Sequence, residues 1–202
     1  MQPPKQDRIL QAALTTFGQR GFHRATMEDI ALSAGVGKGT LYLYFPSKQA
    51  LLEEIFRTGL EAYTTGLQAI ASGPGSAARR LEEMAAFALG FAAANREFAG
   101  LVQEGPVGMR EEFKRWLWGL RGRILNAVRE VAADGVGAGE FRPLDPGLLA
   151  HVFLGGIHSL AAAIVWDAAR HDPAATARSL VDLILAGARP PGRHAVPGAG
   201  AS

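Results

Sequence analysis

Hydrophobic residues recur along this chain at intervals of three and four positions, which is the period of an amphipathic α-helix. In the stretch from Asp7 to Gln19, apolar side chains follow this period at positions 9, 10, 13, 14 and 17. No segment shows sustained alternation of polar and β-branched residues, the pattern that indicates a strand. The sequence therefore predicts an all-α fold of about nine helices.

Capping and turn residues place the boundaries of these helices. Thr26 and Asp29 have the spacing of a capping box, in which each side chain accepts a hydrogen bond from the other residue's backbone N–H. Pro46 ends a third short helix, and Asp145 precedes Pro146 at a favoured N-terminal position. In chain order, helices are expected over residues 7–19, 26–34, 37–44, 47–70, 76–94, 96–103, 110–133, 145–170 and 173–185, with a glycine-rich loop over 134–144.

The helices divide the chain into two folded parts and a tail. The head (residues 1–46) contains three short helices, and the body (residues 47–187) contains the longer ones. Residues 188–202 are rich in glycine and proline, so a disordered tail is expected there.

Charge is distributed unevenly between these parts. The chain has 202 residues, and its formal net charge is only +2. Residues 1–50 contain six Lys or Arg and three Asp or Glu, whereas the remainder contains 15 and 16. The positive charge is thus concentrated at the head, where it favours an anionic partner. Cysteine is absent, which excludes disulfides, cysteine-ligated zinc and a cysteine nucleophile.

Residues 26–45, TMEDIALSAGVGKGTLYLYF, carry the most specific pattern in the head. Two short helices meet at a turn with Gly35, and glycine readily adopts the positive φ that such a turn favours. Leu41 and Phe45 are four residues apart and are expected to pack inward. Lys38 and Thr40 then lie near the N-terminus of the second helix, the part of a recognition helix that enters the major groove. This pattern predicts a helix-turn-helix.

Two other interpretations fit parts of the same segment. The run from Gly35 to Thr40 superficially looks like a phosphate-binding loop. However, Leu32 stands where that motif needs glycine, and Gly39 stands where it needs serine or threonine. The segment before it is an amphipathic helix rather than a buried strand, so this interpretation fails. On the pattern alone, a three-helix cluster without a DNA role stays open.

Taken in order, these residues resemble the TetR family of bacterial one-component transcriptional regulators. The match covers about the first quarter of the chain. Its positions are Ile9, Ala12, Ala13, Phe17, Gly21, Thr26, Ile30, Ala31, Ala34, Gly35, Val36, Gly39, Thr40, Leu41, Tyr42, Tyr44, Phe45, Ser47, Lys48 and Leu51. The resemblance implies an all-α homodimer with a DNA-binding head (1–46) and a ligand-binding and dimerisation body (47–187). The heads would bind a palindromic operator in double-stranded DNA, and a small-molecule effector in the bodies would release it.

The resemblance also assigns DNA contacts by position. It implies contacts to base edges or to the sugar-phosphate backbone at Thr26, Lys38, Gly39, Thr40, Tyr42, Tyr44 and Lys48. The base contacts fall at positions 38–40. The chain departs from many family members at Gly37, where they have a serine or threonine that caps the recognition helix. Glycine is a tolerable cap, so the helix is still expected, without a side-chain contact to phosphate at that position.

The body contains a strongly apolar helix, expected over 145–170, followed by a second over 173–187. Such surfaces are costly in water, so a four-helix interface with a second copy is predicted. The predicted interface residues are Leu149, Val152, Phe153, Gly156, Leu160, Ile164, Leu180, Leu183 and Ile184. The alternative is the central helix of a monomer. Residues 148–166 are also long enough to span a bilayer. They contain two histidines and lack a flanking basic cluster, so we expect a cytoplasmic protein with no membrane partner.

Large apolar residues on the body helices are candidates for an effector cavity, which needs an apolar lining with a few polar groups. The candidates are Met84, Phe87, Phe91, Trp116, Leu120, Phe153 and His158. Core packing is the alternative for each of them. Trp116 and Trp118 cannot share a helix face, so one of them is expected to point outward. His151 and His158 do share a face, but no third ligand is nearby, so neither a metal nor a cofactor is predicted.

The sequence does not predict an enzyme, because it contains neither a G-x-S-x-G nor an H-E-x-x-H motif. The resulting interpretation is a ligand-responsive repressor, a homodimer that a hydrophobic or amphipathic effector releases from its operator. One alternative is an activator, or a repressor that needs a corepressor. Another is a helical module that binds a small molecule or a protein and has no DNA role.

Overall fold

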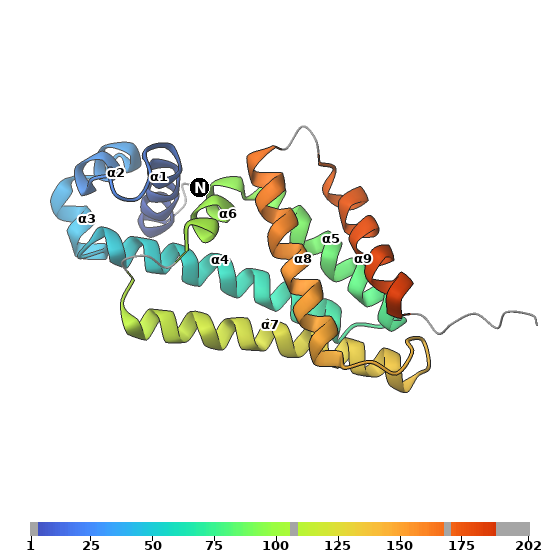
Figure 1. Cartoon of the computed structure of the whole chain (residues 1–202). Coiled ribbons are helices and arrows are strands. Elements are labelled where there is room, and N and C mark those ends of the chain that lie inside the picture. Colours follow the sequence, from blue (N-terminus) through green and yellow to red (C-terminus); the bar gives the residue numbers. More distant parts are fainter. Residues whose placement is uncertain (1–3, 106–108, 168–170, 189–202) are drawn as a thin grey trace, which may run out of the picture.

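The structure of the protein is a computed structural model that describes residues 4–105, 109–167 and 171–188. Within these residues it contains nine α-helices and no β-strand (Figure 1). The predicted all-α class is confirmed.

Three short helices form the head. They are α1 (Lys5–Arg20), α2 (Met27–Ala34) and α3 (Lys38–Tyr44). Gly35, in the turn between α2 and α3, has a φ of 63°, in the left-handed region that glycine adopts without strain. The predicted capping box is present: the Asp29 N–H donates to Thr26 Oγ1 at 3.1 Å, and the Thr26 N–H donates to Asp29 Oδ2 at 3.2 Å.

Six helices form the body. They are α4 (Lys48–Ala71), α5 (Ala77–Ala94), α6 (Arg96–Glu104), α7 (Glu111–Gly137), α8 (Pro146–Trp166) and α9 (Pro173–Ala188). The long helices α4 and α7 lie side by side and extend away from the head (Figure 1). Helix α8 packs on α5 and α7, and α9 packs on α5, which builds a helical bundle at the far end. Helix α6 contacts α1 and α8, so it connects the head with the bundle.

The buried apolar side chains form two clusters. The head cluster contains residues of α1, α2 and α3, among them Ile30 and Leu41. It continues into the beginning of α4, α6 and the beginning of α7 through Phe56, Phe98 and Phe113. The bundle cluster is formed by the end of α4 with α5, α7, α8 and α9. The expected boundary at residue 46 therefore does not coincide with a break in packing.

Helix α7 is longer than the sequence predicted. It continues to Gly137, across the beginning of the segment expected to be a glycine-rich loop. The reason is a close contact at Gly135, where an added Cβ would lie 2.3 Å from the ring of Phe141. The Phe141 N–H also donates to the Gly135 carbonyl at 3.0 Å. Glycine at this position thus lets the chain pack back on the helix, and the turn itself falls at Gly139, with φ of 72°.

Among the described helices, α8 alone is long and apolar enough to cross a membrane, by length and composition only. It packs against α5, α7, α6 and α9 as a member of the helical bundle. Its expected continuation to residue 170 and the expected tail after residue 188 fall on positions 168–170 and 189–202, which lie outside the described residues.

Candidate DNA-binding surface and ligand cavity

The beginning of α3 is exposed at the end of the molecule that is distant from the bundle (Figure 1). Lys38 and Gly39 are exposed and Thr40 is half-buried, so the first turn of the helix is open to solvent. Leu41 is fully buried in the head cluster and fixes the helix from behind. Gly37 occupies the N-cap position without a side-chain hydrogen bond, which leaves the backbone N–H groups of the first turn uncapped by any side chain.

The second half of α3 carries three exposed large side chains. Tyr42 and Tyr44, both predicted to contact DNA, are 42% and 45% exposed. Leu43 lies between them and is 87% exposed, although sequence reasoning assigned it no role. The sequence could have indicated this exposure, because Leu43 lies between two outward-facing tyrosines and two positions after the inward-facing Leu41. An exposed leucine on this surface suits contact with the methyl group of thymine.

Intramolecular bonds hold the head surface in shape. The Arg8 guanidinium donates to the carbonyl oxygen of Ala34 at 2.7 Å, which ties α1 to the end of α2. Lys38 forms an exposed ion pair with Glu28. The hydrogen bond between them raises the pKa of Lys38 and lowers the pKa of Glu28. The side chain that the resemblance places at base edges therefore already has a carboxylate neighbour on α2.

Thr26 is exposed at the N-terminus of α2, where it was predicted to contact the DNA backbone. Its hydroxyl accepts a hydrogen bond from the Asp29 N–H and donates one to Asp29 Oδ2 at 2.8 Å. The bond from Thr26, with a smaller contribution from Arg20 at 2.7 Å, lowers the pKa of Asp29. The Asp29 carboxylate thus stays ionised and keeps the end of the helix capped.

Lys48, also predicted to contact the DNA backbone, is bonded within the protein. Its Nζ donates to the carbonyl oxygens of Phe22, His23 and Ala25 at 2.8, 2.9 and 3.0 Å. The ammonium group also lies 4.8 Å from the centre of the Phe22 ring. Since an ammonium has three N–H donors, all of them are used on the loop between α1 and α2. Lys48 therefore fastens this loop to the first turn of α4.

A buried carboxylate joins α4 to the beginning of α7. The Glu53 side chain is 4% exposed and accepts bonds from the guanidinium and from the backbone N–H of Arg110, which precedes α7. The hydrogen bond from the Arg110 side chain lowers the pKa of Glu53. The start of α7 is thus fixed to α4 one turn and a half after Lys48.

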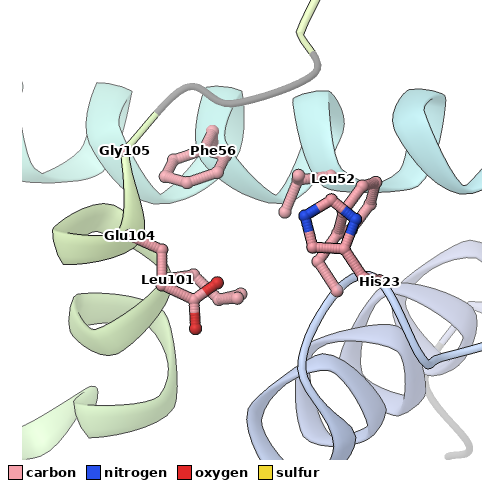
Figure 2. A pocket seen from close by; sticks show the side chains of 7 residues that line it. His23, Leu52, Phe56, Leu101, Glu104 and Gly105 are labelled. Atoms are coloured by element: carbon pink, nitrogen blue, oxygen red, sulfur yellow. The ribbon is translucent and has the colours of Figure 1, made fainter.

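A small cleft separates the head from α6. It has a volume of about 150 Å³ and is lined by Phe22 and His23 of the head, Leu52 and Phe56 of α4, and Leu101, Glu104 and Gly105 at the end of α6. Figure 2 shows His23 on the head side of this cleft, Glu104 on the α6 side, and Leu52 and Phe56 along α4. Nearby, Thr15 of α1 donates to Glu97 of α6 at 3.3 Å. Contacts between head and body are therefore partly polar and leave a gap.

A larger open cavity of about 310 Å³ lies within the body. Its lining comes from five helices, α4 to α8, and is mostly apolar. The lining residues are Leu60, Tyr63, Ala88, Phe91, Ala92, Phe98, Ala99, Val102, Gln103, Leu117, Leu120, Arg121, Ile124, Leu154, Ile157, His158 and Ala161. The volume is at the lower end of the range of pockets that hold drug-sized ligands, about 300–1,000 Å³. The cavity also borders α4, the helix that carries Lys48 and Glu53.

Four polar side chains line this cavity, one from each of four helices. Tyr63 comes from α4, Gln103 from α6, Arg121 from α7 and His158 from α8. Within residues 4–105, 109–167 and 171–188, no hydrogen bond or ion pair involves any of these four side chains. Burial raises the pKa of Tyr63 to about 12, so its hydroxyl keeps its proton at neutral pH.

The structure brings three of the seven predicted ligand residues to the cavity: Phe91, Leu120 and His158. The other four lie elsewhere. Met84 and Phe153 are fully buried in the bundle cluster, and the Phe87 ring stacks on Tyr63 with centroids 6.0 Å apart. Trp116 packs beside Phe113, next to the head cluster, and Trp118 is the outward-facing member of the pair at 71% exposure. Sequence reasoning missed Tyr63, Gln103 and Arg121.

The predicted interface residues on α8 and α9 face two ways. Leu149, Phe153 and Ile164 are buried in the bundle cluster of their own subunit, so their side chains are not open to a second copy. Gly156, Leu160, Leu180 and Ile184 are half-buried and pack against that cluster or, at Gly156, against Leu180. Val152 and Leu183 are 53% and 76% exposed. Leu148 and Trp166 are exposed as well, and the predicted set did not include them.

Among the described residues, no group of three His, Cys, Asp or Glu side chains is arranged to hold a metal ion. His151 and His158 are both exposed on α8, and His151 Nδ1 lies 2.8 Å from the Gly147 carbonyl oxygen.

Comparison with protein families identifies the head. Residues 9–55 match the family described as bacterial regulatory proteins, tetR family. A segment that makes up 32% of the chain is 48% identical to the HTH-type transcriptional regulator RutR of Escherichia coli. The aligned segment covers 31% of RutR. The family match includes the whole helix-turn-helix segment and the first turns of α4.

Similarity to other relatives extends over nearly the whole chain. An uncharacterized HTH-type transcriptional regulator, YhgD of Bacillus subtilis, is 29% identical over 87% of this chain and 90% of its own length. The TetR family regulator PfmR of Thermus thermophilus has a similar structure, with a TM-score of 0.82, 25% identity and coverage of 90% and 98% of the two chains. FadR of Bacillus subtilis, solved in complex with stearoyl-CoA, has a TM-score of 0.78, 22% identity and coverage of 90% and 98%.

Proposed function

This chain belongs to the TetR family of bacterial regulatory proteins, and we propose that it is a homodimeric repressor whose heads bind a palindromic operator until an effector occupies the bodies. It is a ligand-responsive transcriptional regulator. The observation that carries the proposal is the exposed face of α3, which buried Leu41 fixes to a head cluster that continues into α4, α6 and the beginning of α7. Recognition helices with this support enter the major groove by their N-terminal end.

Base readout is assigned to the first turn of α3. Lys38 exchanges its ion pair with Glu28 for acceptors on guanine, and Gly39 and Thr40 allow the backbone to approach the base edges. Leu43 adds apolar contact to a thymine methyl group. Together these contacts give the regulator its sequence preference.

Backbone contacts are assigned to the rim of this surface. Tyr42 and Tyr44 are exposed there and donate hydroxyl hydrogen bonds to phosphate oxygens. The Thr26 hydroxyl donates to Asp29 Oδ2, so Thr26 contributes through its place at the N-terminus of α2, where backbone N–H groups can bind a phosphate oxygen. Lys48 contributes mainly by position, because its three N–H donors hold the loop over residues 22–25, which leads directly to Thr26. This revises the role that the resemblance gives to Lys48.

Dimerisation is assigned to α8 and α9. Leu148, Val152, Trp166 and Leu183 expose large apolar surfaces there, which is costly for a monomer in water. A C2 dimer that buries this surface places two heads on one side of the assembly, as a palindromic site needs. Light scattering should give twice the chain mass of 21.4 kDa, and Leu183→Glu should shift the protein to monomer. A wild-type protein that is monomeric at micromolar concentration contradicts this assignment.

The effector is assigned to the body cavity, whose apolar lining and four polar side chains suit an amphipathic molecule. The relative named fatty acid metabolism regulator protein of Bacillus subtilis, 24% identical over 91% of this chain, and the FadR complex with stearoyl-CoA support acyl-CoA as the class to test first. On this proposal residues 1–46 bind DNA, residues 47–187 bind effector and partner copy, and residues 188–202 form a tail. The regulator works in the cytoplasm, without enzymatic activity.

A mobility-shift assay with the DNA that flanks its own gene tests the proposal. We expect retardation at nanomolar protein at physiological salt, two protected half-sites in a footprint, and release on addition of an acyl-CoA. DNA of the same length and shuffled sequence is the control. Equal affinity for both DNA molecules would refute operator binding, and retardation that requires the acyl-CoA would indicate corepression instead.

A further inference from the structure

The polar side chains of the body cavity form no hydrogen bond or ion pair within the described residues, whereas some other polar side chains of the body are bonded there. Glu140 accepts the N–H groups of Ala77 and Ala78 at 3.1 and 3.2 Å and so caps α5. Arg80 is paired with Asp134 at 2.9 Å. Tyr63, Gln103, Arg121 and His158 converge on one cavity from four helices, and no such bond is formed by any of them in the described part of the chain. Polar groups arranged in this way are available to a ligand.

Tyr63 is half-buried, whereas Arg121 and His158 are exposed. The centroid of the Tyr63 ring lies 6.0 Å from the ring centroid of Phe87 and 5.3 Å from that of Phe91, so these aromatic neighbours fix its orientation. Burial raises its pKa to about 12, and therefore its hydroxyl is a protonated donor at every physiological pH. No acceptor within the described residues bonds this donor. A ligand with an acceptor oxygen among otherwise apolar atoms would satisfy it.

The other polar side chains differ in exposure. Arg121 and His158 are exposed and therefore mark the open side of the cavity, while Phe98, Leu120 and Ile157 are buried in its lining. A ligand that fits has an apolar chain on the buried lining, an acceptor at Tyr63, and a negative group near the Arg121 guanidinium. Acyl-CoA thioesters have these three parts in this order, and in a free fatty acid one carboxylate serves as both acceptor and negative group.

We infer that the cavity takes an acyl compound whose carbonyl oxygen accepts a hydrogen bond from the Tyr63 hydroxyl and whose anionic end lies beside Arg121 and His158. The inference rests on the proposed function, because it assigns the recognition of the effector within the same site. It also connects ligand recognition with the head. Tyr63 belongs to α4, and Lys48 at the beginning of the same helix holds the head loop. The residue that recognises the acyl carbonyl is thus on the helix that supports the DNA-binding head.

The test compares two ligands that differ at the carbonyl. Lauroyl-CoA has a thioester carbonyl, and its thioether analogue, dodecyl-CoA, has a methylene in its place. Calorimetry with the full-length protein measures the Kd of both ligands for wild type and for Tyr63→Phe, which retains the stacked ring. We expect Tyr63→Phe to weaken lauroyl-CoA about five- to tenfold and to leave dodecyl-CoA unchanged. Leu154→Ala, which removes apolar lining without touching the rings around Tyr63, should weaken both ligands to the same extent.

Further measurements distinguish the source of the acyl group and the position of the anionic end. The same experiment is repeated with free laurate in place of lauroyl-CoA. The ligand whose affinity is weakened by Tyr63→Phe is the acyl form that the cavity recognises. Arg121→Gln should weaken that ligand and reduce the salt dependence of its Kd. The inference is overturned if Tyr63→Phe weakens thioester and thioether equally, if it weakens neither, or if wild type binds no acyl compound. The mobility shift without effector tests DNA binding separately, so a failure of the acyl inference is distinguishable from a failure of the proposed function.

Discussion

The head and the body cavity use their polar side chains in opposite ways. In the head, Arg8 bonds the Ala34 carbonyl, Thr26 and Asp29 cap α2, and Lys48 bonds three carbonyl oxygens of one loop. In the cavity, Tyr63 and three other polar side chains have no intramolecular bond in the described residues. The head thus uses polar groups to fix the shape of its surface, whereas the cavity leaves them free for the ligand that we propose.

The same contrast is present in the apolar residues. Leu41 and Phe17 of the head are completely buried, so that each large side chain has a place in a closed cluster. In the body, large side chains such as Phe91 and Leu120 pack around an open volume of about 310 Å³. Substitution of a buried head residue should therefore act through stability, and substitution of a residue around the cavity should act through ligand binding. The following predictions test this distinction, from the largest expected effect to the smallest.

Leu41→Ala should have the largest effect, because it removes a fully buried side chain that fixes α3. We expect a loss of about 2–5 kcal/mol in the free energy of unfolding, together with loss of operator binding. Leu43→Ala, which truncates a neighbouring but exposed leucine, should change stability by less than about 0.5 kcal/mol. Urea unfolding and mobility shifts measure both variants. Equal stability losses would contradict the burial that distinguishes the two positions.

Lys48→Met should destabilise the protein by about 1–3 kcal/mol, because the ammonium bonds three carbonyls of the head loop. Lys38→Met removes only an exposed ion pair, so it should leave stability unchanged and alter the sequence preference for DNA instead. The salt dependence of operator binding separates the roles further. If Lys48→Met lowers the salt slope by about one while stability is unchanged, Lys48 is a phosphate ligand rather than a support.

Glu53→Gln should change the pH dependence of stability. Arg110 lowers the pKa of Glu53 below its ordinary value of 4.5 in the folded protein. The pair therefore stabilises the folded state above about pH 4.5, and this contribution is lost as the pH falls through the folded-state pKa. Glu53→Gln should unfold at lower urea concentration than wild type at pH 7, and the difference should shrink toward pH 3. A constant difference across this range would show that the carboxylate charge is not what matters.

Tyr42→Ala should have the smallest effect on stability, because Tyr42 is exposed, but it should weaken DNA binding about fivefold through loss of a phosphate contact. The loss should be similar for operator and for shuffled DNA, since a phosphate contact carries no sequence information. Fluorescence anisotropy with both DNA molecules measures it. Unchanged affinity would remove Tyr42 from the DNA-binding surface.

The sequence was sufficient for the head because its signals are local. The capping box, the turn at Gly35 and the recognition helix all lie within residues 26–45, and neighbours along the chain are also neighbours in space. Role assignment was less complete: the three carbonyl bonds of Lys48 join residues 23 to 26 positions apart, which no local pattern indicates. Leu43 was missed because exposure is decided by tertiary packing.

The cavity could be predicted only in part because its lining comes from five helices. Met84, Phe153, Phe91 and Leu120 are all large apolar residues on the inward faces of their helices. Met84 and Phe153 are in the core, yet Phe91 and Leu120 line the cavity. Periodicity identifies the inward face of a helix, but it does not indicate whether that face meets another side chain or an open volume. Tyr63 has the same difficulty, because an isolated tyrosine on a long helix is not distinctive until its neighbours are known.

The continuous head cluster has a consequence for protein engineering. One way to exchange DNA-binding modules between regulators, for example to build biosensors with a chosen output promoter, is a cut near the end of the recognition helix. Here a cut at residue 46 would divide one buried cluster, which contains Ile30 and Leu41 of the head together with Phe56, Phe98 and Phe113 of three body helices. A working chimera therefore has to carry the first turns of α4 with its head and to match the surfaces of α6 and α7 in its new host.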